Sequence, residues 1–188
     1  MSGTGTQYGT AGTSSTPSSG WYNTQPTGFS DEAVWVINES TQGALEVGWY
    51  SGYGIGCGCF SSGLQYYYTV NNGLNEHDNV WNYMTPGSTY NFKANHSSAF
   101  HAKIYAARSD GAQVWQPTAS DNYNLYGTGD SQGEVYQPGS MGPATWSAIQ
   151  WSPDGTNWYN WGFNSDCANS PMHVQWLSNN SYKNWGGS

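Results

Sequence analysis

The stretch GALEVGWYSGYGIGCGCF, residues 43–60, decides the fold class, because larger side chains and glycines alternate along almost all of it. Successive side chains of a β-strand point to opposite faces of its sheet. The odd positions from Leu45 to Cys59 therefore form one filled face, while the even positions are mostly glycine. The pattern predicts a strand, or two strands if Ser51-Gly52 turns the chain, with an apolar face and a bare glycine face.

Similar short runs continue along the chain, separated by clusters of Gly, Pro, Asn and Asp. AVWVINES (33–40) is apolar on both faces and predicts a central strand. ATWSAIQW (144–151) and TNWYNWGF (156–163) flank a Ser-Pro-Asp-Gly turn and predict a hairpin. MHVQWL (172–177) predicts a last strand with alternate apolar residues on one face. This spacing favours an all-β fold, a single antiparallel β-sandwich with long Gly/Asn-rich loops, the longest of them from 116 to 141.

The domain organisation follows from a change in composition near residue 20. Residues 1–20 are rich in Gly, Ser and Thr and predict a flexible N-terminal tail. Residues 21–188 then form one β-sandwich domain, a size that suits a single core. The first twenty residues lack the apolar segment of a secretory signal. We therefore expect an extracellular or cell-surface protein exported without a leader, with a cytoplasmic location as the alternative.

Charge excludes some partners. The chain has only 4 Lys and Arg against 12 Asp and Glu, for a net charge of −8. Binding to nucleic acid requires a basic surface that neutralises several phosphates, so nucleic acid is excluded as a partner. Neutral, hydroxyl-rich partners, glycans or neutral lipid headgroups, fit the composition better. Low charge also permits homo-oligomers formed by strand addition.

The metal-binding and redox patterns in the sequence are weak. Cys57-Gly58-Cys59 lacks the C-x-x-C spacing of redox motifs, and one of the pair could instead form a disulfide with Cys167. The four histidines lie at spacings that separate them on strands, so we assign no metal ligands. The oxygen-rich segment 121–134 could hold a calcium ion, although it does not match an EF-hand. No cofactor is expected beyond that calcium ion.

One motif suggests catalysis. Gly129-Asp130-Ser131-Gln132-Gly133 matches G-x-S-x-G, but the strand before it and the helix after it that a nucleophile elbow needs are not evident. No acid/base pair or triad is apparent elsewhere. The sequence therefore predicts a glycine-rich loop here, no catalytic residues, and a protein that is not an enzyme.

The chain is rich in aromatic residues, with 11 Trp and 15 Tyr among its 188 residues. Flat rings beside amide and carboxylate groups bind sugars, because the ring covers the C–H face and the polar groups take up the hydroxyls. The segment after the Pro-Asp-Gly turn has this composition. The predicted ligand-binding residues are Trp158, Asn160, Trp161, Tyr159, Asp154, Asn157, Trp115 and Tyr53.

The stretch VWVINESTQGALEVGWYSG, residues 34–52, resembles the opening strands of leaderless β-sandwich proteins, the aegerolysins and the actinoporin-like cytolysins and lectins. The resemblance implies recognition of lipid or glycan at a surface. Residues 1–20 cannot form the amphipathic helix that membrane insertion by an actinoporin requires, so pore formation by this chain alone is not implied.

Three functions are compatible with these features. The favoured one is a non-catalytic recognition module that binds carbohydrate or neutral lipid headgroups through exposed Trp and Tyr. The alternative is a self-assembling structural protein, such as a fibre, coat or surface-layer subunit, in which strands add between copies. A hydrolase is the third, and it lacks an evident catalytic constellation.

Overall fold

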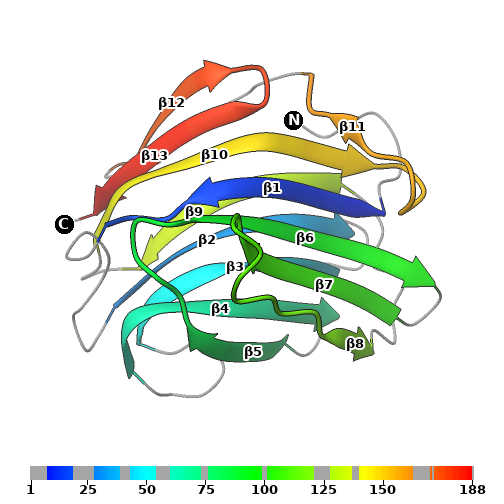
Figure 1. Ribbon diagram of the computed structural model, residues 1–188, viewed down its shortest axis with the longest axis horizontal. Helices are drawn as coiled ribbons and strands as arrows, with labels where there is room; N and C mark the ends of the chain where they lie inside the picture. The colour runs from blue at the N-terminus through cyan, green and yellow to red at the C-terminus, as the bar shows by residue number, and fades with distance from the viewer. Residues whose placement is uncertain are drawn as a thin grey trace.

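The computed structural model describes residues 8–18, 28–38, 43–53, 60–72, 76–98, 101–120, 128–136, 140–162, 170 and 172–187. Every regular element within these residues is a β-strand, and the strands pair into two antiparallel sheets. The prediction of an all-β antiparallel sandwich is confirmed (Figure 1).

One sheet has eight strands, and seven of them form the path β12-β13-β10-β1-β6-β7-β8, with β11 paired to β10. Its strands in chain order are β1 (Gly9–Ser15), β6 (Thr89–Ser98), β7 (His101–Arg108), β8 (Thr118–Ser120), β10 (Ser140–Ser152), β11 (Tyr159–Asn160), β12 (Met172–Ser178) and β13 (Ser181–Gly187).

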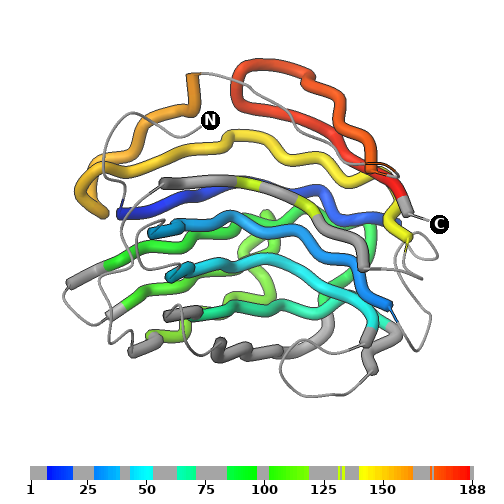
Figure 2. The backbone as a smooth tube through the Cα atoms, turned by 180° about the vertical axis from the view of Figure 1, so that it is seen from behind, coloured from blue at the N-terminus to red at the C-terminus, as the bar shows by residue number. Residues whose placement is uncertain are grey.

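The other sheet has five strands in the order β5-β4-β3-β2-β9. In chain order they are β2 (Phe29–Asn38), β3 (Gly43–Tyr53), β4 (Phe60–Asn72), β5 (Glu76–Tyr83) and β9 (Thr128–Tyr136). Figure 2 shows β2, β3 and β4 running side by side in this sheet. The central position of β3 fits its sequence, because such a strand must bury one face against the other sheet.

The alternation in residues 43–53 sets which face of β3 is buried. Leu45, Val47 and Trp49 are fully buried in the core between the two sheets, as the pattern predicts. The even positions, including Gly48, point to the other side of the sheet. A Cβ on Gly48 would collide with the backbone carbonyl of Glu32 on β2, so only glycine allows this close approach.

Other predicted elements are also present. The two strands β10 and β11 form the predicted hairpin, with Gln150 opposite Asn160 and Trp151 opposite Tyr159. Alternate residues of β12, beginning with Met172, pack against the core from one face, as predicted. β2 lies between β3 and β9, which agrees with a strand that is apolar on both faces.

Two segments differ from prediction. Residues 9–15 form β1, which pairs with both β10 and β6 in the middle of the eight-stranded sheet, so this part of the expected tail is a structural strand (Figure 1). Within the expected long loop, residues 128–136 form β9 along the whole of β2. Both segments consist mostly of small or polar residues. Their backbones pair with neighbouring strands although the sequences offer little apolar surface.

Candidate functional site

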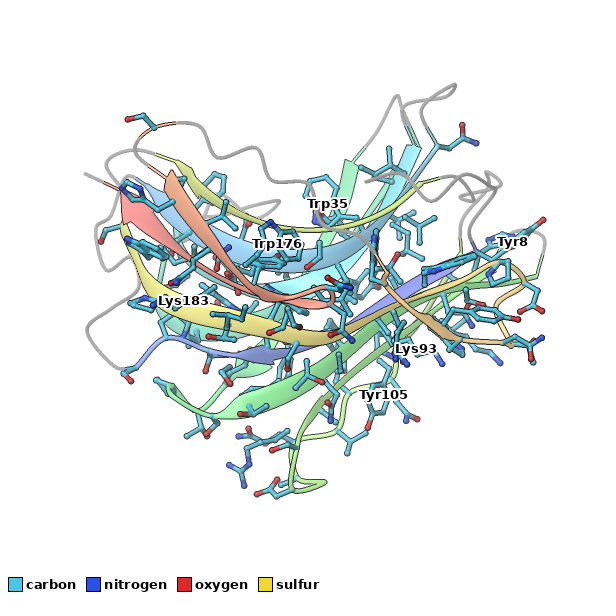
Figure 3. All side chains as sticks on the ribbon, turned by 90° about the horizontal axis from the view of Figure 1, so that it is seen from above. Tyr8, Trp35, Lys93, Tyr105, Trp176 and Lys183 are labelled. Carbon is cyan, nitrogen blue, oxygen red and sulfur yellow. The ribbon has the colours of Figure 1, made fainter. Side chains whose placement is uncertain are left out.

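The outer face of the five-stranded sheet, turned away from the other sheet, carries a carboxyl group at its centre. Glu46 lies on β3, directly opposite Trp35 on β2 and Thr69 on β4. Its exposed fraction is 9%, so the carboxyl is partly shielded by its neighbours. Figure 3 shows Trp35 on this outer side and Lys93 on the opposite side of the molecule. We refer to this surface as the Glu46 face.

Aromatic residues surround Glu46 on the same face. Ala33, Tyr50 and Tyr67 form a buried cluster here, with Phe29 and Trp35 packed against it. The rings of Tyr50 and Tyr67 meet edge to face, with 6.2 Å between centroids. Such packing holds the rings in fixed positions.

The backbone of β2 is fixed at the point where Trp35 projects from it. Thr10 on β1, in the opposite sheet, donates a hydrogen bond from its hydroxyl to the carbonyl oxygen of Trp35 at 2.6 Å. Thr10 is fully buried. This hydrogen bond links β2 to the eight-stranded sheet at the position of Trp35. The position of Trp35 on the Glu46 face is therefore set by a strand that the sequence predicts to be a tail.

A further acidic residue occupies a register position on this face in β9. Asp130 lies opposite Trp35 in the β2–β9 pairing, as Glu46 does in the β2–β3 pairing. Alternation along antiparallel strands puts directly paired residues on one face, so the Asp130 position belongs to the Glu46 face. Neighbouring strands lie about 4.8 Å apart, so the two backbones are about 10 Å apart with Trp35 between them. Gln132 lies at the next position on this face, opposite Ala33.

The ionisable residues are divided between the sheets. The strands of the five-stranded sheet contain acidic residues and no Lys or Arg, whereas the strands of the eight-stranded sheet contain all the Lys and Arg residues and no acid. The acidic residues are Asp31, Glu32, Glu46, Glu76, Asp78, Asp130 and Glu134. The basic ones are Lys93, Lys103, Arg108 and Lys183. The Glu46 face therefore belongs to the acidic half of the molecule.

Glu32 is one of these acids and has a different environment. It lies on β2 with the parity of Val34 and is fully buried between the sheets. Burial raises the pKa of its carboxyl group from 4.5 to about 8. The group is therefore protonated in neutral and acidic solution. It is fully enclosed, whereas Glu46 is 9% exposed on the outer face.

The G-x-S-x-G motif forms no nucleophile elbow. It lies in β9, and Ser131 points between the sheets, where its hydroxyl is 2.8 Å from the Tyr182 hydroxyl. Gly133 allows close packing, because a Cβ there would collide with the side-chain amide of Asn184 and contact Glu32. The interpretation as a loop is wrong, because these residues form a strand.

Part of the predicted ligand-binding set lies in the β10–β11 hairpin. The Asp154 carboxylate accepts hydrogen bonds from the Asn157 backbone and side chain and from the Thr156 backbone. These bonds, led by the one from the Asn157 backbone, lower the pKa of Asp154 to about 2. Asn160 accepts a hydrogen bond from Gln150 at 3.0 Å. Asp154 and Asn157 thus build the turn.

The predicted aromatic ligands are scattered. The Lys93 ammonium lies 4.0 Å from the ring centre of Trp158, and Tyr159 is 51% exposed beside Trp151. Trp161 packs on the core, and so does Trp115, which contacts Tyr66 and Tyr68. Tyr53 ends β3, and its side chain lies outside the described residues. The predicted residues of the hairpin thus share one element, whereas Trp115 packs against Tyr66 and Tyr68.

The cysteine and calcium predictions fall largely outside the described residues. These are Cys57, Cys59 and Cys167 and the segment 121–127. Within the described ranges, no group of three or more His, Cys, Asp or Glu side chains is arranged to hold a metal ion. The same residues include no helix long and apolar enough to cross a membrane.

Comparison with solved structures identifies proteins with this architecture. Two crystal structures of scytalido-glutamic peptidase, one with a peptide-based transition-state analogue and one with a transition-state analogue inhibitor, match with a TM-score of 0.68. Their sequence identity is 9%, and the match covers 99% of this chain and 95% of the peptidase. SCP-B, a member of the eqolisin family of peptidases solved with the tripeptide Ala-Ile-His, matches with a TM-score of 0.62, 10% identity, and 96% and 92% coverage. No family model and no curated protein matches the sequence.

These matches correct the functional predictions. The non-catalytic module binding glycan or lipid, the structural subunit offered as its alternative, and the prediction that the chain is not an enzyme are all contradicted, because the shared fold is that of peptidases. The resemblance to aegerolysins and actinoporin-like proteins stays a prediction, as do the partners and the location.

Sequence reasoning missed Glu46 and Trp35 because it sought catalytic groups close together in the chain. The available indication was Glu46 itself, a charged residue on the glycine face of a strand with an apolar opposite face. Such a residue has to be exposed or functional. Over nearly its whole length, the chain has the fold of the eqolisin-family peptidases.

Proposed function

We propose that this protein is a peptidase that works in acidic solution, with the carboxyl group of Glu46 as its central reactive group. The observation that carries the proposal is the position of Glu46 at the middle of the outer face of a sheet whose fold matches glutamic peptidases. Scytalido-glutamic peptidase has been solved with a peptide-based transition-state analogue and with a transition-state analogue inhibitor.

The two Glu residues whose burial is described on β2 and β3 differ in access. Glu32 is fully enclosed between the sheets, so no peptide can reach it. Glu46 lies on the outer face, beside Trp35. A general acid or base has to come within hydrogen-bond distance of the reacting atoms, which excludes Glu32 and favours Glu46.

Amide hydrolysis needs two proton transfers. One group takes a proton from the attacking water, and one gives a proton to the leaving nitrogen. We assign Asp130 as the partner of Glu46, because both residues pair with Trp35 from opposite sides. In acidic solution one carboxyl group can be ionised and act as the base while the other is protonated and acts as the acid.

Trp35, which is only partly buried, provides an apolar surface on which a peptide would lie. An extended peptide over β2 would have its backbone between the Glu46 and Asp130 positions and its side chains against Trp35. Apolar contact of this kind positions the scissile bond, which accounts for a large part of a typical enzyme's rate enhancement.

The test is digestion of a peptide library between pH 2.5 and 7, with products read by mass spectrometry. Cleavage should be strongest in acid. Glu46→Gln and Asp130→Asn should each lower kcat/KM by about 10²- to 10⁴-fold, the usual contribution of a general acid or base. Asp110→Asn, which removes a carboxylate paired with Arg108 on the far sheet, is the control and should cleave normally. Absence of cleavage at every pH, or full activity of Glu46→Gln, would overturn the proposal.

A further inference from the structure

The enclosed carboxyl of Glu32 lies in a polar cluster between the two sheets. Ser14 on β1 donates a hydrogen bond to Glu32 Oε2 at 3.3 Å. The side chains of Asn184 on β13, Trp49 on β3 and Trp146 on β10 also direct hydrogen-bond donors at the carboxyl group. Four strands besides β2 thus contribute to this cluster, from both sheets of the sandwich.

The cluster is nearly dry and incompletely bonded. Glu32, Trp49 and Trp146 are fully buried, and Asn184 is 4% exposed. Glu32 Oε1, both indole nitrogens and Asn184 Oδ1 form no well-aligned hydrogen bond. A neutral carboxyl group tolerates such surroundings, but a carboxylate would require strong donors or a cation to offset the loss of water.

No cation is available among the described neighbours. The side chains around Glu32 from β1, β3, β10 and β13 are the uncharged groups of the cluster, and β9 contributes Gly133. The lysines of the packed strands do not face Glu32: Lys183 on β13 has the opposite parity to Asn184 and lies over the Trp185 ring, and Lys93 on β6 lies over the Trp158 ring. The acidic residues Glu46 on β3 and Asp130 on β9 occupy positions on the outer face. The remaining titratable residues near the core are tyrosines and one histidine. Tyr182 on β13 bonds to Ser131, Tyr90 on β6 donates to Gln113, and His96 lies at the other end of β6, beside Tyr8.

We propose that the protonated carboxyl of Glu32 is an internal latch that holds the two sheets together in acidic and neutral solution and releases them when the proton is lost. The geometry points to β2 as the strand that moves, because β2 carries Glu32 on its inner face and Trp35 on its outer face. Ionised Glu32 would draw water between the sheets beneath Trp35. This inference does not depend on the proposed peptidase activity.

The pH dependence has a definite sign. The pKa of Glu32 is about 8 in the folded protein, against 4.5 as the ordinary value. Its contribution to stability is complete below pH 4.5, where folded and unfolded chains are both protonated. Between these values the folded state binds the extra proton, so unfolding becomes easier as pH rises. The contribution is lost once the pH passes about 8.

The experiment compares urea unfolding of the wild type and Glu32→Gln from pH 4.5 to 8.5. The amide keeps the shape of the protonated acid but cannot ionise. We expect the wild-type unfolding constant to rise by up to about tenfold per pH unit relative to the variant, a cumulative change on the order of a thousandfold. Asp110→Asn, which alters an exposed carboxylate, should follow the wild type. Equal pH slopes in the wild type and Glu32→Gln would overturn the proposal.

A second measurement requires no variant and remains decisive if Glu32→Gln fails to fold. The infrared spectrum of the native wild type at pH 6.5 should contain the carbonyl band of a protonated carboxyl group. The band should disappear above pH 8.5 together with the folded fluorescence of Trp49 and Trp146, which flank the group. A spectrum without that band at pH 6.5 would contradict the latch.

Discussion

Glu32 and Glu46 lie on neighbouring, paired strands and experience opposite environments. Glu32 has the parity that points between the sheets, where burial keeps it protonated. Glu46 has the parity that points outward, beside Trp35. The comparison teaches that position along a strand, more than residue type, determines whether a carboxyl group is enclosed between the sheets or faces outward in this fold.

The two glutamates should differ most in the loss of unfolding free energy when each side chain is shortened to alanine. Glu32→Ala leaves a cavity and removes the acceptor of Ser14, so we expect a loss of about 3 kcal/mol in the free energy of unfolding at pH 5. Glu46→Ala should cost less, about 1 kcal/mol, because Glu46 is 9% exposed on the outer face and water can enter the space that the side chain leaves. Urea denaturation of both variants measures the difference. Equal losses would mean that Glu46 also has a core role.

The close contact between β2 and β3 gives the next largest effect. Gly48→Ala should lower the free energy of unfolding by about 2 to 3 kcal/mol, because the new Cβ collides with the Glu32 carbonyl. Gly162→Ala is the matched control, since nothing lies within 4 Å of its Cβ position. It should change stability by less than about 0.5 kcal/mol. If Gly48→Ala left the free energy of unfolding unchanged, β2 and β3 could move apart without loss of stability.

The smallest effect is expected at Ser131. Ser131→Ala removes the partner of the Tyr182 hydroxyl and should cost about 1 kcal/mol of stability. Peptide cleavage should persist at the wild-type rate, because this hydroxyl lies between the sheets. Thermal unfolding and the peptide assay together test the point. Loss of cleavage in a well-folded variant would instead assign chemistry to the inner side of β9.

The strand pattern could be predicted from the sequence wherever one face was clearly apolar. Leu45, Val47 and Trp49 revealed β3, and Met172 and Val174 revealed β12. The polar strands β1 and β9 could not be found in this way. Their stability comes from backbone pairing with neighbours distant in sequence, which leaves no local pattern.

The candidate site was harder to predict than the fold. Glu46, Trp35 and Asp130 come from three strands, and only the pairing register brings them to one place. The aromatic residues around the hairpin were more conspicuous in the sequence. Asp154 is an example, because its bonds to Asn157 and Thr156 stabilise the turn itself. The residue types show where polar groups occur in the sequence. They do not show whether a polar group stabilises a turn or belongs to the candidate site.

The location of β1 also bears on how the molecule is made. Gly9 pairs with Ser152, and Ser15 pairs with Thr145. The pairing of β1 with β10 can therefore form only after residues far along the chain are present. Contacts of such long sequence separation slow folding. When only the first half of the chain has been synthesised, β10 is not yet present to pair with β1. We therefore expect assembly to be late and largely post-translational, with β1 inserted between β6 and β10 near its end.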